Sequence, residues 1–393
     1  MDIVIVSQYL RNIESLTENN SRFIYLAKLL VKNGNEVEII TSDFYHSTKR
    51  HFQSADKLSG IKITMQHESG YKKNISIKRF ASHKELGKNI GKYLELRKNP
   101  DLVYCAVPSL DVAGQVAKFC AKEHVKFAVD IQDLWPEAFK MVVNIPVISD
   151  IVFMPMKNQA NRIYQMADKI IAVSETYASR ARFVNKKCLD SRVVYLGTEK
   201  KTFEQLIPKN ETLNDLIKIA YVGSMSASYD LNTVIDAISQ MPNHANVKLI
   251  AMGDGSLREQ FMQSAKKRRI QAEFTGRLPY LEMVAKLKSC DIAVNPITKG
   301  SAGSIINKVG DYAMAGLPVV NTQESDEYRQ LLDEYKAGIN CQCESVDEVS
   351  EALELLIKDE QLRKTVAENS LRLGKERFDR EQTYQEIINY ITN

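Results

Sequence analysis

The sequence predicts an α/β protein with two doubly wound domains, each built on a parallel sheet. Short apolar runs of strand length alternate with amphipathic stretches of helix length along most of the 393 residues. Alternation of this kind is typical of βαβ units, whose strands are buried on both faces of the sheet. The rhythm stops in the polar stretch 199–216 and then restarts, which indicates a boundary between two similar domains.

The expected elements follow one another in a regular order. Helical stretches occupy 21–34, 111–124, 306–316 and a long region from Val346. Gly34 and Gly316 each end a helix, because glycine adopts the left-handed conformation at a helix end without steric cost. Strand-like runs occupy 2–7, 36–42, 101–107 and 127–131 in the first half, and 217–225, 247–255, 272–278, 291–297 and 317–322 in the second.

The composition excludes disordered, collagen-like and coiled-coil chains. Apolar residues make up 44% and charged residues 26%, which is ordinary for a folded protein. No apolar run reaches the roughly 18–20 residues of a membrane-spanning helix, and the chain opens on a strand-like run rather than a secretory signal. We therefore expect a cytoplasmic protein. The six cysteines are scattered, and only Cys341 and Cys343 lie close together, so we expect buried thiols and no zinc site.

The net charge of +4 hides an asymmetry between the two halves. Residues 1–200 carry 30 Lys and Arg against 21 Asp and Glu, so the first half is expected to face an anionic partner. Nine cations lie within 72–98, and the stretch 141–156 is mostly apolar with two prolines. Together they fit an enzyme at an anionic membrane surface, with a solvated helix face and a buried helix as alternatives. No binding motif or pattern of interleaved aromatics indicates a nucleic-acid partner.

The helix within 306–316 carries one acidic residue, Asp311, near its expected start. A carboxylate in that position can bind a ribose diol, and the free amides of the helix start can hold a diphosphate. The alternative is that Asp311 caps the helix or faces solvent. These free amides belong to Gly303, Ser304, Ile305 and Ile306.

Several motifs in order resemble one enzyme family. AYVGSM, IAMGDGSLREQF, FTGRLPYLEMVAKLKSCDIAVNPI and NKVGDYAMAGLPVV resemble the nucleotide-sugar domain of retaining glycosyltransferases of family 4. QYL with NNSRFIYLAKLLVKNGNEVEIITSDF resembles the opening of the family's acceptor domain, and DIQDLWPEAF and ADKIIAVSETY resemble its middle. The DLWPE form most resembles the bacterial branch that builds capsular and O-antigen polysaccharides, including the N-acetylfucosamine transferases.

The resemblance implies the GT-B fold, with two facing Rossmann-like domains. An acceptor domain would span 1–200, a nucleotide-sugar domain 201–375, and a helix at 376–393 would return to the first domain. The donor would be a UDP-sugar, and the acceptor a polyprenyl-diphosphate-linked sugar or oligosaccharide at the inner membrane face. The family retains the anomeric configuration and requires no metal or cofactor. Catalysis would consist largely of positioning and of stabilising the leaving diphosphate.

The resemblance assigns Asp311 to the second acid of the family's E-x7-E motif, which binds the ribose. The first acid, which touches the donor sugar, falls at Gly303, so the sequence departs from the family pattern there. Asn307 and Lys308 could then reach the sugar and the diphosphate. The alternative for Lys308 is an ordinary solvated lysine.

A second departure concerns the diphosphate. Many members carry an Arg and a Lys after the first strand of the donor domain, where this chain has only serines, alanine and methionine after Gly223. The charge would fall on the amides of Gly223 and Ser224 and on Lys308 or Arg277, with Gly253 also in the nucleotide site. Arg277 could stack on the uracil, and an ordinary surface arginine is the alternative.

A third departure lies in the acceptor domain. Many members have a catalytic histidine where this chain has Gln132, so histidine catalysis is unsupported. The adjacent Asp133 is a candidate base or orienting carboxylate for the acceptor hydroxyl, and Glu137 is a second candidate. The alternative is that Asp133 caps a helix beginning at Trp135 and Pro136.

A glycine-rich loop of the family is replaced here by NNSR. Asn20 could hydrogen-bond the acceptor and Arg22 could meet its phosphate, unless Asn20 or Ser21 only caps the helix. The later segment FYHSTKRH carries His46 and His51 beside Lys49 and Arg50. The two histidines lack metal-ligand spacing, so we expect no metal site there, and contact with the substrate stays open.

Two other functions stay open. A nucleotide-sugar 2-epimerase shares the paired domains but needs acids and a histidine around the sugar that the sequence does not reveal. A catalytically decayed nucleotide-sugar-binding partner would explain why Gly303, Ser224 and Gln132 lack the usual side chains.

Overall fold

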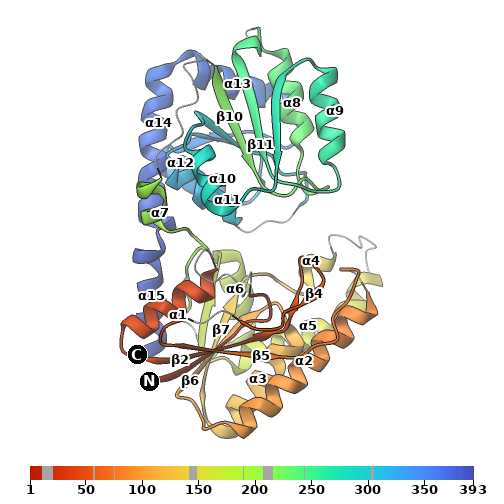
Figure 1. The fold of residues 1–393 in the computed structure, drawn as a ribbon, viewed down its shortest axis with the longest axis vertical. Helices are drawn as coiled ribbons and strands as arrows, with labels where there is room; N and C mark the ends of the chain where they lie inside the picture. The colour runs from red at the N-terminus through yellow and green to blue at the C-terminus, as the bar shows by residue number, and fades with distance from the viewer. Residues whose placement is uncertain are drawn as a thin grey trace. The chain divides into compact units, whose positions relative to one another are not determined.

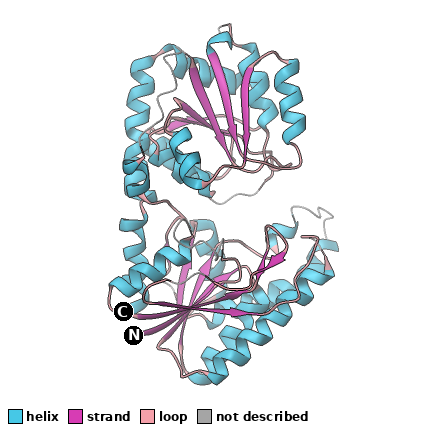
Figure 2. Ribbon diagram, in the orientation of Figure 1, coloured by secondary structure: helices cyan, strands magenta, loops and turns pink. Residues whose placement is uncertain are grey.

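The computed structural model describes residues 1–10, 21–55, 58–74, 76–140, 148–188, 190–206, 216–242, 244–301 and 305–393. The chain forms two compact units, Met1–Val194 with Tyr384–Asn393, and Tyr195–Thr383. The boundaries expected from the sequence lie after residues 200 and 375, whereas the units divide after Val194 and Thr383. Each unit is a parallel sheet between layers of helices (Figures 1 and 2), so the predicted doubly wound α/β class is confirmed.

The sheet of the first unit has seven strands in the order β5-β2-β1-β6-β7-β8-β9. The order reverses between β1 and β6, and ligands of doubly wound sheets bind beyond the carboxyl ends of the strands at such a switch point. A short antiparallel pair, β3 and β4, follows β2. The strands are β1 (Asp2–Val6), β2 (Glu36–Ser42), β3 (Phe44–Tyr45), β4 (Arg50–His51), β5 (Ile61–Gln66), β6 (Leu102–Val107), β7 (Lys126–Ile131), β8 (Lys169–Ala172) and β9 (Arg192–Val193).

The alternation of side chains along β1 builds a separate core on each face of this sheet. Ile3 and Ile5 pack with α1 and with the end of α15, whereas Val4 and Val6 pack with α2 and α3. All four are fully buried. The helices are α1 (Arg22–Lys32), α2 (Ile77–Leu96), α3 (Leu110–Glu123), α4 (Glu137–Lys140), α5 (Ile148–Met166), α6 (Glu175–Val184) and α15 (Arg380–Thr392), whose last residues belong to this unit.

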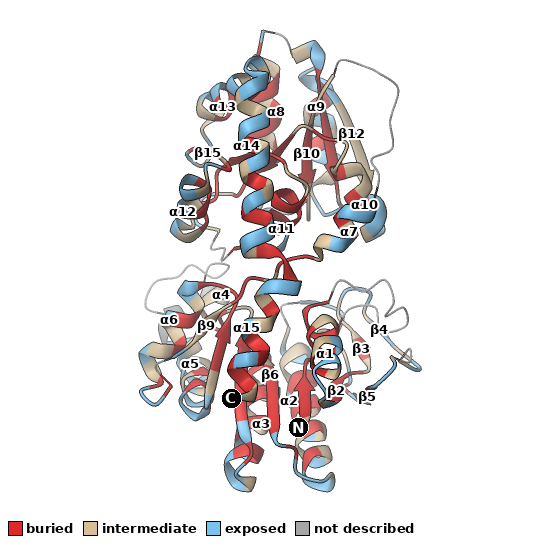
Figure 3. Ribbon diagram, turned by 90° about the vertical axis from the view of Figure 1, so that its left-hand side faces the viewer, coloured by how far each residue is buried: buried red, intermediate tan, exposed pale blue. Residues whose placement is uncertain are grey.

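The sheet of the second unit has six strands in the order β12-β11-β10-β13-β14-β15, with the same reversal between β10 and β13. The central strands of this sheet are mostly buried, the edge strands β12 and β15 are half-buried, and exposed residues lie on the outer faces of the helices (Figure 3). The strands are β10 (Ile217–Val222), β11 (Val247–Met252), β12 (Gln271–Gly276), β13 (Ile292–Asn295), β14 (Val319–Asn321) and β15 (Gly338–Asn340).

Helices enclose this second sheet. A 3-10 turn at His244–Asn246 and a π-helical turn at Gly374–Phe378 supplement them. The helices are α7 (Lys200–Gln205), α8 (Leu231–Gln240), α9 (Arg258–Lys267), α10 (Tyr280–Leu287), α11 (Asn307–Met314), α12 (Asp326–Tyr335), α13 (Val346–Lys358) and α14 (Glu360–Leu373).

Three smaller expectations can be compared with the structure. Gly34 and Gly316 follow the ends of α1 and α11 with φ of 79° and 69°, which confirms both as helix stops. All six cysteines are free, and five of them are buried, while Cys343 is half-buried. Among the described residues, no helix combines the length and apolar character needed to cross a membrane.

Candidate functional site

Two glycines form the floor of the switch point in the second unit. Gly223 follows β10 with φ 144°, and Gly253 follows β11 with φ 152°. A Cβ atom on Gly253 would lie 1.8 Å from the carbonyl oxygen of Gly223, so a side chain at this position would require the backbone to move. The amide of Gly223 donates to the carbonyl of Met252 at 3.0 Å, and the amide of Gly253 donates to that of Gly276 at 2.9 Å. The expectation that the Gly223 amide would hold the diphosphate is therefore wrong.

Lys308 of α11 places its ammonium group at this floor. The Nζ atom would lie 3.6 Å from a Cβ atom on Gly223. It sits 4.3 Å from the ring centroid of Tyr221 and 4.4 Å from that of Tyr229. Lys308 is 7% exposed, and its Nζ has no hydrogen-bond partner in the described part of the chain. The alternative of an ordinary solvated lysine is therefore wrong.

Burial lowers the pKa of Lys308 well below its ordinary value. A buried cation without a hydrogen-bonded partner is costly, because the ring faces of two tyrosines replace only part of its hydration. An anion bound above Gly223 would restore this lost interaction.

Asp311 lies one turn further along α11 and is 8% exposed. The hydroxyl of Tyr280 donates to its Oδ1 at 2.8 Å, and the hydroxyls of Tyr280 and Thr198 lie 2.5 Å apart. Burial raises the pKa of Asp311 to about 6, while hydrogen bonds from Tyr280 and Thr198 and the charge of Arg380 oppose this rise. The helix starts after Ile306, so Asp311 neither caps it nor faces solvent.

The other predicted donor residues differ in their burial and contacts. The carbonyl of Ser224 accepts from the hydroxyl of Tyr221 at 2.5 Å. Arg277 is exposed and directly follows Gly276, the partner of Gly253. Asn307 is exposed at the start of α11, and Ile305 is buried, whereas Gly303 and Ser304 lie outside the described residues.

In the first unit, Asp133 follows β7 and holds the turn that comes after it. Its Oδ1 accepts from the amide of Leu134 at 2.9 Å, and its carboxylate also accepts from the indole of Trp135. Burial is the main reason that its pKa is raised. Helix α4 begins only at Glu137, so the predicted capping of a helix that starts at Trp135 and Pro136 is wrong.

The neighbours of Asp133 have different environments. Glu137 accepts from the Nε atom of Arg180 at 2.7 Å in an ion pair, which occupies the carboxylate proposed as a second base. Gln132 is half-buried, and its Nε2 has no hydrogen-bond partner among the described residues. Its backbone amide donates to the carbonyl of Val107 at 3.0 Å.

Arg22 does not reach outward to an acceptor phosphate. Its side chain is buried in the first unit, where Nε donates to Asp130 at 2.7 Å and Nη1 to the carbonyl of Val194 at 3.0 Å. The expected phosphate contact is wrong, because Asp130 offers a charge-assisted bond inside the core. Asn20 lies outside the described residues, and the side chain of Ser21 makes no capping bond to α1.

Sequence reasoning missed a cluster of aromatic, histidine and arginine side chains in the first unit, called the aromatic cluster below. Tyr9 follows β1, and its hydroxyl lies 3.1 Å from His83 Nε2 and accepts from Arg79 Nη2 at 3.1 Å. The ring of His83 stacks on Trp135 at 5.8 Å, and the guanidinium of Arg79 lies 4.8 Å from the same indole. The Nε of Arg79 is buried without a hydrogen-bond partner in the described part of the chain. The cluster comprises Tyr9, His46, Tyr71, Arg79, His83 and Trp135.

The pKa values of both histidines of the aromatic cluster are lowered. Burial, followed by the charge of Arg79, lowers the pKa of His83 to about 3. Burial and the charges of Lys49 and Arg79 lower the pKa of His46 to about 4. The His46 Nδ1 atom lies 2.5 Å from the hydroxyl of Tyr71. The first unit thus contains one buried imidazole, that of His83, and one half-buried imidazole, that of His46.

Comparison with known proteins identifies related sequences and folds. Residues 202–372 match the family described as glycosyl transferases group 1. The uncharacterized glycosyltransferase MJ1069 of Methanocaldococcus jannaschii is 25% identical over 242 residues, which cover 59% of this chain and 60% of that relative's length.

Solved structures resemble the whole chain. Anabaena Alr3699/HepE in complex with UDP has a TM-score of 0.70 at 17% identity, with 100% of both chains covered. Sucrose-phosphate synthase from Thermosynechococcus elongatus has a TM-score of 0.76 at 12% identity, covering 100% of this chain and 98% of the other. WaaG, a glycosyltransferase involved in lipopolysaccharide biosynthesis, has a TM-score of 0.71 at 14% identity, with both chains fully covered. The expected GT-B fold is confirmed.

Proposed function

We propose that this chain, whose second unit matches the group 1 glycosyl transferases and whose fold is that of GT-B enzymes, transfers a sugar from a UDP-sugar with retention of configuration. The acceptor would be a lipid-linked or free saccharide in surface polysaccharide synthesis. One observation carries the proposal: the ammonium group of Lys308 is buried without a hydrogen-bond partner among the described residues, at the glycine floor of the second sheet.

A diphosphate is the group that this floor fits best. Gly253 packs directly against the backbone of Gly223, whereas Gly223 leaves free the space beside the ammonium group of Lys308, which supplies a positive charge there. A diphosphate oxygen would give Lys308 a charge-assisted hydrogen bond and would itself be stabilised as a leaving group. Lys308 would thereby replace the Arg and Lys that the chain lacks after Gly223.

Asp311 would bind the ribose through its remaining acceptor capacity. A carboxylate has about four lone-pair positions, and the hydroxyls of Tyr280 and Thr198 use two of them. Asn307 and the segment that contains Gly303 and Ser304 would contact the sugar, and Arg277 the base.

The acceptor would bind in the first unit, at the aromatic cluster. The ring of Trp135 offers an apolar face to a sugar, and the Nε of Arg79, which has no hydrogen-bond partner among the described residues, offers a charged donor to a phosphate oxygen. Asp133 lies next to this indole, and its raised pKa suits a residue that accepts the proton of a sugar hydroxyl. The chemistry would be retaining and would need no metal, with Lys308 as the charge that the leaving group meets.

The surface of the first unit supports attachment to the inner face of the cytoplasmic membrane. Lys84, Lys88 and Lys92 are exposed at four-residue spacing on α2. On α5, Ile151 and Val152 are 65% and 63% exposed. Anionic lipid attracts each suitably placed cation by roughly 1 kcal/mol, and exposed apolar side chains insert at the interface.

The decisive experiment measures UDP release from a UDP-sugar, with and without lipid-linked saccharide acceptors. Release that depends on the acceptor and falls in Lys308→Ala supports the proposal, with Lys267→Ala on the exposed face of α9 as the matched control. UDP binding without release in any mixture would instead indicate a binding partner. Conversion of the donor to its 2-epimer without an acceptor would indicate an epimerase.

A further inference from the structure

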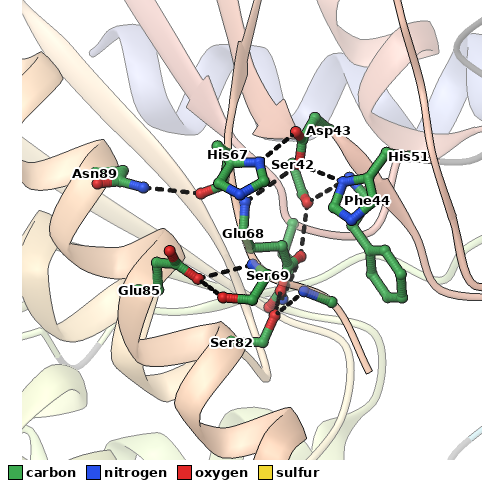
Figure 4. Close-up of polar contacts among 12 residues, drawn as sticks. Ser42, Asp43, Phe44, His51, His67, Glu68, Ser69, Ser82, Glu85 and Asn89 are labelled. Carbon is green, nitrogen blue, oxygen red and sulfur yellow. Dashed lines mark hydrogen bonds and ion pairs between the residues drawn. The ribbon is translucent and has the colours of Figure 1, made fainter. Parts of the chain in front are cut away.

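We propose that the first unit binds one divalent late transition-metal ion of the zinc class through Asp43, His51 and His67. The carboxylate and the Nδ1 atoms of the two imidazoles face one another at one edge of the sheet (Figure 4). The proposal does not depend on the transferase function, because neither Lys308 nor the glycines Gly223 and Gly253 take part.

Three elements distant in sequence bring the ligands together. Asp43 directly follows β2, His51 ends β4, and His67 directly follows β5. Asp43 Oδ2 lies 2.8 Å from His67 Nδ1, and Asp43 Oδ1 lies 3.3 Å from His51 Nδ1. One ligand atom from each residue lies within 4.8 Å of the others. In a tetrahedral zinc site with bonds of about 2.0–2.1 Å, ligand atoms are roughly 3.3 Å apart. The two imidazole rings, which stack with centroids 5.4 Å apart, would rotate so that both Nδ1 atoms face the ion.

The backbone fixes the central ligand in place. The amide of Asp43 donates to the carbonyl of Gln66 at 3.0 Å, and the carbonyl of Asp43 accepts from the amide of Phe52 at 2.7 Å. The amide of Glu68 donates to Asp43 Oδ1 at 3.2 Å. Such outer hydrogen bonds orient a metal-binding carboxylate and leave its second oxygen for the ion.

The donor set selects the class of metal. Two imidazole nitrogens and one carboxylate oxygen suit zinc, copper and nickel, whereas calcium and magnesium prefer oxygen ligands only. The imidazole of His67 is 62% exposed and that of His51 is 37% exposed, so water can reach the fourth position. Metal-ligand spacing in the sequence does not indicate this group, because its second imidazole, that of His67, follows a different strand from the one that His51 ends.

A bound ion would join the hairpin β3–β4 to the ends of β2 and β5. The turn of that hairpin carries His46 and Lys49, which both contact Tyr71 of the aromatic cluster. The ion would therefore hold one wall of this cluster, and it would stabilise the folded state because the unfolded chain lacks the assembled ligands.

The test is titration of the metal-free protein with zinc chloride. Binding is measured by calorimetry and by competition with a chromogenic chelator. We expect one ion per chain, an affinity at least about tenfold weaker in His67→Ala, His51→Ala and Asp43→Asn, and no change in His124→Asn. His124 is an exposed histidine outside the group, at a left-handed position that asparagine tolerates. Cobalt should give the absorption bands of four-coordinate geometry in the wild type and lose them in His67→Ala.

Two further measurements complete the test. Zinc should raise the melting temperature of the wild type but not of His67→Ala, and it should slow amide exchange within 44–52. His67 is exposed, so its alanine variant is expected to fold, which circular dichroism checks. No binding at about 0.1 mM free zinc, or equal binding in the wild type and all three ligand variants, would show that these residues form only an Asp–His ion-pair group.

Discussion

Lys308→Met replaces the buried ammonium with an apolar side chain of similar length, and it should affect stability and UDP binding in opposite directions. Lys308 has no hydrogen-bond partner among the described residues, and burial lowers its pKa. An unsatisfied buried group costs about 1–3 kcal/mol or more when charged. Its contacts with the rings of Tyr221 and Tyr229 return about 1–2 kcal/mol.

The net effect on the ligand-free protein is therefore a gain of about 1 kcal/mol in the free energy of unfolding. For a unit the size of Tyr195–Thr383, this gain corresponds to a rise of about 2–4 °C in melting temperature. UDP should lose one charge-assisted hydrogen bond, worth about 1.5–3 kcal/mol, so its Kd should rise roughly 10- to 150-fold.

Differential scanning fluorimetry and isothermal titration calorimetry measure these two effects. Uridine, which has no phosphate, should bind the variant and the wild type equally. Lys267→Met, an exposed substitution on α9, should change neither quantity. A Lys308→Met protein that is folded and binds UDP as tightly as the wild type would refute the placement of the diphosphate at Gly223.

Three further predictions concern Asp311, Asp133 and metal ions. The pKa of Asp311 is raised to about 6, so the folded state keeps this proton longer, and up to about 3 kcal/mol of stability should be lost as pH rises from about 4 through 6. Denaturation at several pH values should show this loss in the wild type and not in Asp311→Asn. UDP should raise the melting temperature of the wild type, and Asp311→Ala should lose most of this stabilisation. Asp133→Asn keeps an acceptor for the amide of Leu134 but cannot take a proton, so turnover should fall roughly 100-fold or more at an unchanged melting temperature, and full activity would end the catalytic assignment. Because EDTA would also remove an ion held by Asp43, His51 and His67, metal independence is tested in His67→Ala, whose turnover EDTA should leave unchanged; a loss that manganese restores in this variant would contradict metal-independent transfer.

The local features of the fold could be predicted from the sequence. The strand-like run at 36–42 coincides with β2, and Gly34 and Gly316 end the helices that they were expected to end. These features depend on neighbouring residues, because periodicity and helix-end chemistry act over a few positions. The position of Gly223 at the end of β10 follows from the same local pattern.

The partners of the site residues could not be predicted in this way. Arg22 is buried because Asp130, far along the chain, accepts its guanidinium, and no local pattern records that pairing. The same holds for Asp311, whose Tyr280 and Thr198 partners come from other segments. Long-range pairing of polar side chains is fixed only when the sheets have assembled.

The aromatic cluster illustrates the same limit. Tyr9, His83 and Trp135 belong to separate loops and helices, and each alone resembles an ordinary core aromatic or histidine. Tyr9 follows β1, Trp135 follows β7, and His83 lies in α2 after β5, so their common position follows from the strand order β5-β2-β1-β6-β7. The sequence showed the strands but not which of the residues beyond them would meet.

The return of residues 384–393 to the first unit has a consequence for how the protein is made. Tyr384, Ile387 and Ile391 are fully buried in the core that contains Ile3 and Ile5. On the ribosome, the first unit therefore emerges early but lacks part of its core until residues 384–393 have been synthesised. Domains usually complete their folding in the order of synthesis. Here the second unit, whose residues 195–383 emerge before this segment, can finish first, and a fragment that stops at Val194 would expose an apolar surface to aggregation.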